Sequence, residues 1–434
     1  VFSDIFLTKT SSPRLEYFSG RLALDCKPID MIYLSDIFNK FTQNSPSGII
    51  SRNKGSEDQC DKLNVVISDT TLRDGEQMPG IFFTKDMKIK LAKSLSSAGV
   101  PLIEAGFPVV SNEEFESIRQ IVDACPDSII QVIARPKRQD VQAALDTGAG
   151  SIAIFIGTSP IHLSKKLGIK LDELLFIIEK EIKFASKNGR QVIFTAEDAT
   201  RTPIEDLLRV FEVAAQAGAH SLGLADTVGI ALPNTFSEIV GSVVDSTTLP
   251  VAVHCHNDIG LATANSLAAI NSGASGVQCS ILGIGERAGN APLEQVLLGL
   301  KILGKYRTGI NIKNTMLLVK LVSEYTGIEV PPFMPVVGAN AFTHESGLHI
   351  DGILGDPRTY EPYSPDLIGR ERHIVLGKHS GSRAVRKVAD DLGIEINEQD
   401  INRVVAYIKD NSNYSLSASD ALLRAMDSIG IQNL

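Results

Sequence analysis

The chain has 434 residues, of which 43% are hydrophobic and 21% are charged, as is usual for a globular protein with an extensive core. Its formal net charge of −9 argues against nucleic acid as a main partner, because phosphate binding requires a basic surface. No run of about 18 apolar residues is present, so we expect no membrane contact. Five widely spaced cysteines without a CxxC pair indicate reduced thiols and a cytoplasmic location.

Residues 1–62 differ from the rest of the chain. They are rich in Ser, Asn and Phe and contain no long periodic element. An organelle-targeting peptide is rich in Arg and poor in acidic residues. This segment instead carries acidic residues along its length, among them Asp4, Glu16, Asp25, Asp30 and Asp36. We therefore expect a poorly ordered N-terminal extension.

From residue 64 onward, short runs rich in Val, Ile and Ala alternate with longer amphipathic stretches. Near-continuous apolar runs are typical of strands that are covered on both faces. The predicted strands are 64–69, 101–106, 129–135, 151–157, 191–196, 220–225, 250–256 and 276–282. The first predicted helix begins at Thr84, an N-cap residue, and Gly99 follows its end. The other predicted helices are 111–123, 137–147, 172–188, 204–217, 234–245, 261–272 and 292–304.

Eight strand-then-helix units predict a parallel (β/α)8 TIM barrel over residues 63–330, with a doubly wound open sheet as the alternative. Polar side chains follow nearly every predicted strand, and they decide between the two. A barrel brings all of these strand ends onto one face, whereas an open sheet spreads them along an edge. The residues are Asp69, Arg73, Asp74, Glu104, Arg135, Thr158, Ser159, Glu197, Asp198, Asp226, Thr227, His254, His256, Glu286, Arg287 and Asn290.

His254 and His256 are two residues apart on a predicted strand, so both imidazoles face the same side and Cys255 faces the other. Two such histidines beside a strand-end carboxylate predict a metal site. We expect Asp74 as the third ligand and Asn290 as the fourth. Imidazole and oxygen donors suit Mn²⁺, Zn²⁺, Co²⁺ or Mg²⁺. Few protein ligands would leave open positions for a substrate.

Arg73 lies next to Asp74 and could neutralise a developing oxyanion, or it could form a salt bridge that orients Asp74. Glu197 and Thr227 are candidates to hold polar groups of the substrate. A Glu that faces a substrate carboxylate requires a cation between the two, which makes Glu197 the harder assignment. The Gly-rich segment 283–290 follows the last predicted strand, where barrels often bind phosphate groups.

Residues 331–385 have few helical periods and many functional side chains, which predicts a linker or lid. His349 is a candidate general base, with Glu345 as its support, although a hydrogen-bonded linker histidine is an alternative. Residues 386–434 are expected to form a small helical C-terminal subdomain.

Six separated motifs occur in an order that closely resembles the isopropylmalate and homocitrate synthases. They are DTTLRDGEQMPG (69–80), IEAGFP (103–108), HCHNDIGLATANSLAA (254–269), GIGERAGNAPLE (283–294), HESGLHIDG (344–352) and LGKHSG (376–381). The resemblance covers about residues 64–385. It implies that a divalent metal polarises a 2-oxo acid and that a base deprotonates acetyl-CoA, whose enolate attacks the ketone before water cleaves the thioester.

The same resemblance implies residue roles. Asp74, His254 and His256 are similar to metal ligands, with Asn290 close to the metal. Arg73, Glu197 and Thr227 are similar to residues that contact the substrate. His349 is similar to a catalytic histidine that reaches into the barrel of the partner subunit of a homodimer.

For the identity of the 2-oxo acid, the resemblance favours homocitrate synthase by a narrow margin, with 2-isopropylmalate synthase as the close alternative. LADTVG (224–229) and HIDG (349–352) favour a homocitrate synthase acting on 2-oxoglutarate, and the short segment after 381 speaks against a leucine-binding regulatory domain. FPVVSNEEFE (107–116) and TSPIH (158–162) favour 2-isopropylmalate synthase acting on 2-oxoisovalerate. Methylthioalkylmalate and citramalate synthases are weaker alternatives. A second substrate carboxylate would be received near Arg135, Thr158 or Thr195.

Two other classes are possible. A 3-hydroxy-3-methylacyl-CoA lyase would carry a Cys in the loop at 283–294, where this chain has none. A binding or structural protein that has lost catalysis is disfavoured, because Arg73, Asp74, His254, His256 and His349 are all intact.

Overall fold

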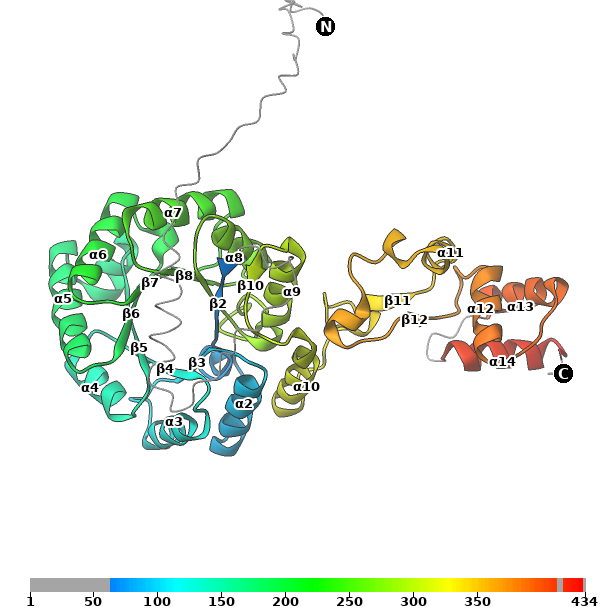
Figure 1. Cartoon of the computed structure of the whole chain (residues 1–434), viewed down its shortest axis with the longest axis horizontal. Helices are drawn as coiled ribbons and strands as arrows, with labels where there is room; N and C mark the ends of the chain where they lie inside the picture. Colours follow the sequence, from blue (N-terminus) through cyan, green and yellow to red (C-terminus); the bar gives the residue numbers. More distant parts are fainter. Residues whose placement is uncertain (1–62, 412–416, 432–434) are drawn as a thin grey trace, which may run out of the picture. The chain divides into compact units, whose positions relative to one another are not determined.

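The structure is a computed structural model that describes residues 63–411 and 417–431 (Figure 1). Eight parallel strands form a closed barrel in chain order, in which the last strand pairs with the first through Val66 and Gly276. The closure rules out the open-sheet alternative. The strands are β2 (Val66–Asp69), β3 (Leu102–Gly106), β4 (Ile129–Ala134), β5 (Ser151–Gly157), β6 (Gln191–Glu197), β7 (Ser221–Asp226), β8 (Val251–Cys255) and β9 (Gly276–Cys279).

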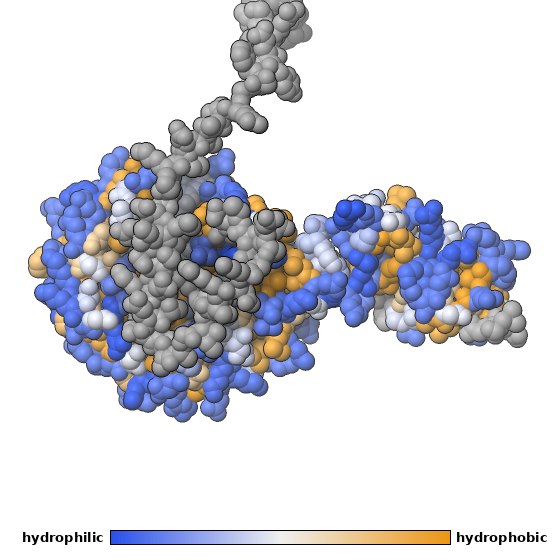
Figure 2. All heavy atoms as spheres, in the orientation of Figure 1, coloured by the Kyte–Doolittle hydropathy of each residue, from blue (hydrophilic) through white to orange (hydrophobic). Residues whose placement is uncertain are grey.

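A helix follows each barrel strand, and the helices form an outer ring (Figure 1). Their bounds lie within two residues of the predicted ones. They are α2 (Lys85–Ser97), α3 (Asn112–Ala124), α4 (Arg138–Asp146), α5 (Leu171–Lys187), α6 (Ile204–Gln216), α7 (Pro233–Ser246), α8 (Ala262–Asn271) and α9 (Leu293–Leu303). Thr84 caps α2 by accepting a hydrogen bond from the amide of Met87, as its sequence position predicts. Charged and polar side chains cover much of the outward surface of the ring (Figure 2).

The strands alternate between two buried faces. On β6, Val192, Phe194 and Ala196 pack outward in the core shared with the helices. Thr195 alternates with these residues and so faces the barrel interior, beside Gly223, where an added Cβ would lie 2.6 Å from the Thr195 hydroxyl oxygen. Glu197 shares this face by the two-residue period of a strand. The strand ends therefore present their polar residues to the mouth of the barrel.

Several short elements were not foreseen from the sequence. β1 (Leu63–Asn64) pairs with β10 (Tyr306–Arg307), and α10 (Thr315–Thr326) follows the 3-10 turn η5 (Ile312–Asn314). The predicted elements did not include α10, although Thr315, Leu318, Val319 and Val322 form a buried stripe at helical spacing.

The lid segment 331–385 is more structured than its polar, Gly-rich sequence suggests. It contains α11 (Gly347–Gly355), the strand pair β11 (Thr343–His344) and β12 (His373–Ile374), and the 3-10 turns η6 (Ala339–Phe342), η7 (Pro357–Thr359) and η8 (Pro365–Ile368). The expectation of few helical periods was wrong for α11. Its three glycines weaken the helical signal, but Ile350 and Ile353 are buried at helical spacing.

The C-terminal part is helical, as expected. It consists of α12 (Ser382–Asp391), α13 (Glu398–Asp410) and α14 (Ala418–Ser428), which share an apolar core that includes Val385, Val404 and Leu422. The first of these helices begins at Ser382. Within the ranges that the structure describes, none of the helices has the length and apolar character that crossing a bilayer requires. The expectation for residues 1–62 falls outside the described ranges.

Candidate active site and metal centre

Asp74, His254 and His256 form a buried group at the mouth of the barrel. Asp74 lies on the turn between β2 and the 3-10 helix η1 (Gly75–Gln77), His254 lies on β8, and His256 follows that strand. One ligand atom from each residue lies within 4.8 Å of the others. The two histidine Nε2 atoms are 3.1 Å apart, and Asp74 Oδ2 lies 3.3 Å from His254 Nε2 and 3.8 Å from His256 Nε2. The sequence therefore predicted this cluster correctly as a spatial group.

Among the atoms that meet in the cluster, Asp74 Oδ2 has no hydrogen-bond partner. Asp74 Oδ1 accepts a hydrogen bond from the amide of Glu286 at 3.3 Å, whereas Asp74 Oδ2 has no partner with acceptable geometry. His256 Nδ1 lies 3.3 Å from the carbonyl oxygen of Gly289. A carbonyl oxygen only accepts, so His256 Nδ1 carries the proton and Nε2 presents a lone pair. Buried polar atoms without partners are rare, and Asp74 Oδ2 is such an atom beside the Nε2 atoms of both histidines.

The electrostatics of the cluster suit a cation. Burial alone would raise the pKa of Asp74, but Arg73 and the two histidines hold it well below its usual range. Burial and the neighbouring His254 lower the pKa of His256 to about 4. At neutral pH the cluster is thus a carboxylate beside a neutral imidazole, the forms in which these groups bind metals. The residues present fit a divalent ion.

Asn290 lies against this cluster on the loop that follows β9. Its backbone forms an isolated β-bridge with His256, and its side-chain amide donates to the carbonyl oxygen of Ile284 at 3.1 Å. The Oδ1 atom of Asn290 is buried without a partner. The loop needs its glycines, because a Cβ on Gly289 would lie 1.9 Å from the carbonyl oxygen of Gly283. Asn290 therefore has a free oxygen next to the histidines.

Arg73 is anchored by Glu104, a residue that the sequence marked only as a strand-end carboxylate. Arg73 Nε lies 2.5 Å from Glu104 Oε1, while its Nη1 lies 3.7 Å from Asp74 Oδ2. Glu104 also accepts hydrogen bonds from Thr70, Gln131 and Gln278 at 2.6 to 2.9 Å. Because β3 and β9 are not neighbours, the contact with Gln278 crosses the barrel interior. Glu104 thus fixes the guanidinium beside Asp74.

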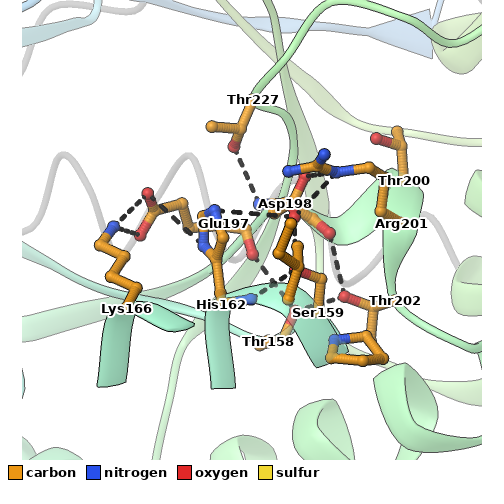
Figure 3. Close-up of polar contacts among 12 residues, drawn as sticks. Thr158, Ser159, His162, Lys166, Glu197, Asp198, Thr200, Arg201, Thr202 and Thr227 are labelled. Atoms are coloured by element: carbon orange, nitrogen blue, oxygen red, sulfur yellow. Dashed lines mark hydrogen bonds and ion pairs between the residues drawn. The ribbon is translucent and has the colours of Figure 1, made fainter. Parts of the chain in front are cut away.

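Glu197 ends β6 and is paired with Lys166 (Figure 3). Lys166 Nζ lies 2.6 and 2.8 Å from the two carboxylate oxygens of Glu197. Lys166 belongs to η2 (His162–Leu167), a π-helical turn that follows β5. His162 from the same turn lies 3.9 Å from Glu197 Oε1 and 3.7 Å from Asp198 Oδ2. The sequence did not single out Lys166, since its pairing spans 31 residues.

Asp198 joins the loops after β5, β6 and β7 (Figure 3). It is fully buried with a left-handed backbone at φ 63°, and its carboxylate accepts hydrogen bonds from Arg201 Nε at 2.8 and 3.0 Å and from Ser159. The amide of Asp198 donates to the hydroxyl of Thr227 at 2.8 Å. Since that hydroxyl is already an acceptor, its own proton remains available to another group.

Thr195 faces the interior of the barrel, whereas Arg135 is partly exposed and paired with another residue. Thr195 faces the barrel interior on the same side of β6 as Glu197. Arg135, in contrast, pairs with Asp140 at 2.5 and 3.2 Å, lies 5.4 Å from the ring centroid of Phe107, and has a side chain that is 47% exposed. Its guanidinium is already engaged, so the structure does not bring it together with the other predicted substrate contacts.

The two predicted lid residues have separate partners. The ring of His349 on α11 stacks on Tyr360 with centroids 4.0 Å apart. Glu345 accepts a hydrogen bond from the amide of His379 at 3.1 Å. The structure thus gives His349 an aromatic neighbour in place of the carboxylate support that the sequence suggested. His344 lies 3.4 Å from Glu361 Oε1.

Cys255 packs on the outer face of β8, opposite the histidines, as its strand position predicts. It is fully buried, and burial raises the pKa of its thiol well above the ordinary value. We therefore expect little thiolate at this position in the folded protein.

Two family models match the chain. The HMGL-like model matches residues 64–322, and the model described as homocitrate synthase post-HMGL domain-like matches residues 336–415. Solved structures support the same fold. An HMG-CoA lyase from Bacillus subtilis matches with a TM-score of 0.56 at 21% identity, over 62% of this chain and 95% of its own. One from Brucella melitensis has the same score and identity, over 61% and 100%.

Curated relatives are more similar in sequence. A probable 2-isopropylmalate synthase of Methanopyrus kandleri is 45% identical, over 80% of this chain and 69% of its own length. A homocitrate synthase AksA of the same organism is 44% identical, over 83% and 90%. A 2-isopropylmalate synthase of Sulfurisphaera tokodaii is 43% identical, over 82% and 92%. Since one model covers more than half of the chain and these relatives are matched over most of their length, the chain belongs to the HMGL-like family.

Proposed function

We propose that the protein is an acyltransferase that condenses acetyl-CoA with a 2-oxo acid and hydrolyses the resulting thioester, in the cytoplasm. The observation that carries this proposal is the buried group of Asp74, His254 and His256 at the barrel mouth, whose ligand atoms lie within 4.8 Å of one another, with Arg73 fixed beside it. The names of the relatives, 2-isopropylmalate synthase and homocitrate synthase, agree with this reaction.

Asp74, His254 and His256 would hold a divalent ion, with Asn290 Oδ1 as a further oxygen donor. The bound ion would supply Lewis acidity toward the carboxylate and ketone of a 2-oxo acid. Arg73, held by Glu104, would place a fixed positive charge where the ketone oxygen becomes an alkoxide. Mn²⁺, Mg²⁺, Zn²⁺ and Co²⁺ all remain compatible with this donor set.

Thr227 would donate its free hydroxyl proton to the carboxylate of the oxo acid. This role is supported by the hydrogen bond from the amide of Asp198, which occupies a lone pair of the hydroxyl and fixes its position. Glu197 lies on the interior face of β6, next to β7, and would orient polar groups of the substrate from there.

His349 would remove a proton from the methyl group of acetyl-CoA. We propose that it does so in the barrel of a second subunit, so that the working unit is a homodimer. Tyr360, stacked on the His349 ring, restricts the orientation of the imidazole. Glu345 would shape the lid through the His379 amide and support His349 only indirectly.

Two 2-oxo acids remain in competition. The homocitrate reading needs a group that receives the second carboxylate of 2-oxoglutarate, and two of the three expected groups are engaged elsewhere. Arg135 pairs with Asp140, and the hydroxyl of Thr158 lies 2.7 Å from that of Thr202. Thr195 is left as a neutral hydroxyl inside the barrel.

A specific observation favours the second candidate, 2-isopropylmalate synthase. The strand period places Ile133 of β4, Phe155 of β5 and Ile193 of β6 on the interior face, whereas their neighbours Val132, Ile154 and Val192 belong to the outer core. Phe155 meets Phe107 edge-on at 6.4 Å. Such an apolar wall suits the branched chain of 2-oxoisovalerate, although one methylene of difference changes selectivity by only about 1–3 kcal/mol.

The deciding experiment measures CoA release from acetyl-CoA by the purified protein with Mn²⁺ or Mg²⁺. It compares 2-oxoglutarate with 2-oxoisovalerate at equal concentration, with pyruvate as a third substrate. Faster release with 2-oxoglutarate would establish a homocitrate synthase, and faster release with 2-oxoisovalerate would establish a 2-isopropylmalate synthase. The absence of metal-dependent CoA release with all three oxo acids would contradict the proposed function.

A further inference from the structure

We propose that Lys166 is a charge-compensating positioning residue of the oxo-acid site. Its ammonium group neutralises Glu197 and so allows an anionic substrate to bind beside that carboxylate. This inference rests on the proposed function, because it assumes that the anion is a 2-oxo acid. It answers the difficulty that Glu197 presents from sequence alone, namely a carboxylate facing a carboxylate.

The contact between Lys166 and Glu197 is a complete ion pair. Lys166 Nζ lies within hydrogen-bond distance of both oxygens of Glu197, at 2.6 and 2.8 Å (Figure 3). The lysine side chain is 50% exposed and that of the glutamate 19%. Lys166 therefore reaches inward from the rim of the barrel to a carboxylate that is shielded from solvent and needs a counter-ion.

The backbone that carries Lys166 is unusual. Residues 162–167 form a π-helical turn that ends at Gly168, which has a left-handed backbone with φ 68°. π-Helical turns are rare and are concentrated at functional sites. The turn starts with His162, whose ring packs so closely on Gly157 that a Cβ there would lie 2.2 Å from Nδ1. Gly157 and His162 thus fix the turn over the end of β5, and Lys166 follows four residues later.

The other charged groups near Glu197 are already occupied or too distant. The carboxylate of Asp198 is neutralised by Arg201. His162 approaches Glu197 only to 3.9 Å, beyond hydrogen-bond distance. Among the residues that the structure describes, Lys166 is therefore the cation that directly compensates Glu197.

The substrate site is close enough for this charge to matter. Neighbouring strands lie about 4.8 Å apart, so β6 and β8 are separated by roughly 10 Å across β7. An oxo acid that extends from the cluster of Asp74, His254 and His256 toward β6 would therefore approach the Glu197 side chain. Without Lys166, two negative charges would face one another in a partly buried space, and substrate affinity would fall.

The experiment measures binding of the 2-oxo acid to the full-length, metal-loaded protein by calorimetry without acetyl-CoA. The probe is whichever of 2-oxoglutarate and 2-oxoisovalerate supports faster CoA release. Four variants are compared with the wild type, namely Lys166→Met, Lys166→Arg, Glu197→Gln and the double variant Lys166→Met/Glu197→Gln. Lys165→Met is the matched control, because Lys165 lies on the same turn and is exposed. Metal content and thermal unfolding establish that each variant is folded.

We expect Lys166→Met to weaken binding about tenfold, a value limited by the half-exposed position of the lysine. Lys166→Arg and Lys165→Met should bind as the wild type does. The double variant should bind the oxo acid more tightly than Lys166→Met does, because removing the Glu197 charge removes the need for compensation. In steady state, Lys166→Met should raise KM for the oxo acid and leave KM for acetyl-CoA unchanged.

Either of two results would overturn the proposal. Wild-type affinity in Lys166→Met would show that Glu197 needs no counter-ion, and equal loss in the single and double variants would show a purely structural role. Both results leave the proposed function intact as long as the wild type releases CoA. A wild type that binds neither oxo acid would overturn the proposed function together with the inference.

Discussion

The two sides of the barrel mouth satisfy their polar groups in different ways. On the side of β2, β8 and β9, Asp74 Oδ2, His254 Nδ1 and Asn290 Oδ1 are buried without hydrogen-bond partners. On the side of β5, β6 and β7, the carboxylates of Glu197 and Asp198 are paired at both oxygens. The first side thus contains a carboxylate oxygen without a partner, whereas both carboxylates of the second side are paired, although His162 Nδ1 there also lacks a partner.

The difference between unpaired and paired polar groups indicates where a ligand is required. Leaving buried polar atoms unpaired costs free energy, so such a cluster is maintained only where another group completes it. Carboxylates that are paired instead hold loops and charges in place and need no ligand for their stability. We therefore expect variants on the first side to affect metal binding, and variants on the second side to affect stability or substrate charge.

His254→Ala gives the largest expected effect. The variant should lose metal binding and CoA release together, because the donors that remain after the loss of one of the two imidazoles hold a divalent ion weakly. In the wild type, free Mn²⁺ at 100 times its Kd should raise the free energy of unfolding by about 2.7 kcal/mol, and in the variant this gain should disappear. Metal analysis and urea unfolding measure both, with His373→Ala as the control. Tight metal retention by the variant would refute the ligand assignment.

His349→Ala tests a residue that belongs to neither side. Loss of a general base typically lowers turnover about 100-fold or more, while metal and oxo-acid binding should stay unchanged. Mixing this inactive variant with inactive Asp74→Asn should restore part of the activity if His349 acts across a dimer. Absence of recovery under subunit-exchange conditions would count against action in trans, and near-normal turnover of the single variant against the role itself.

Asp198→Ala tests the side with paired carboxylates. Removing this carboxylate leaves Ser159 and Arg201 without their acceptor, and we expect the free energy of unfolding to fall by about 2 kcal/mol. Metal affinity should not change, since Asp198 contacts none of the three cluster residues. Urea unfolding and metal titration on the same samples provide the test, with Ser159→Ala as a milder control. A variant that loses metal but keeps full stability would show that this side of the mouth supports metal binding and not stability.

The pH dependence of stability tests the protonation of two buried carboxyl groups, Asp69 and Glu294. Burial raises the pKa of Asp69 to about 7, and burial likewise raises that of Glu294 to about 7. Because both folded-state values exceed the unfolded ones, the native state binds more protons between about pH 4 and 7, and stability falls as the pH rises through this range. Each group contributes a slope of up to about 1.4 kcal/mol per pH unit.

Asp69→Asn removes one titrating group while it keeps a similar shape. Its free energy of unfolding should depend less steeply on pH than that of the wild type. The measurement is urea denaturation from about pH 4.5 to about 8, which covers both transitions. An unchanged slope would mean that Asp69 is ionised in the native state at all of these values.

The smallest expected effect concerns Cys255. Its buried thiol has a pKa well above the ordinary value, so little thiolate forms and alkylating reagents should not modify it in the native protein. Peptide mapping after iodoacetamide treatment should find Cys255 unlabelled without denaturant and labelled in urea. Labelling of the native protein together with loss of metal would show that β8 opens.

The sequence by itself determined the barrel and the group of Asp74, His254 and His256 at its mouth. Strand and helix boundaries follow local periodicity, and the two-residue period alone places His254 and His256 on one face with Cys255 on the other. Barrel closure then brings Asp74 to them from 180 residues away, a consequence of topology that the alternation of elements already implies.

Only the tertiary structure decided which charges meet. Arg73 with Glu104, Lys166 with Glu197 and Arg135 with Asp140 each combine a strand end with a side chain from another loop or helix, and long flexible side chains reach several possible partners from similar positions. Their pairing depends on distances of a few ångströms at the barrel mouth, which no periodicity encodes. The helix α11 was likewise hidden from the sequence, because its glycines weaken the local signal and buried contacts of Ile350 and Ile353 stabilise it instead.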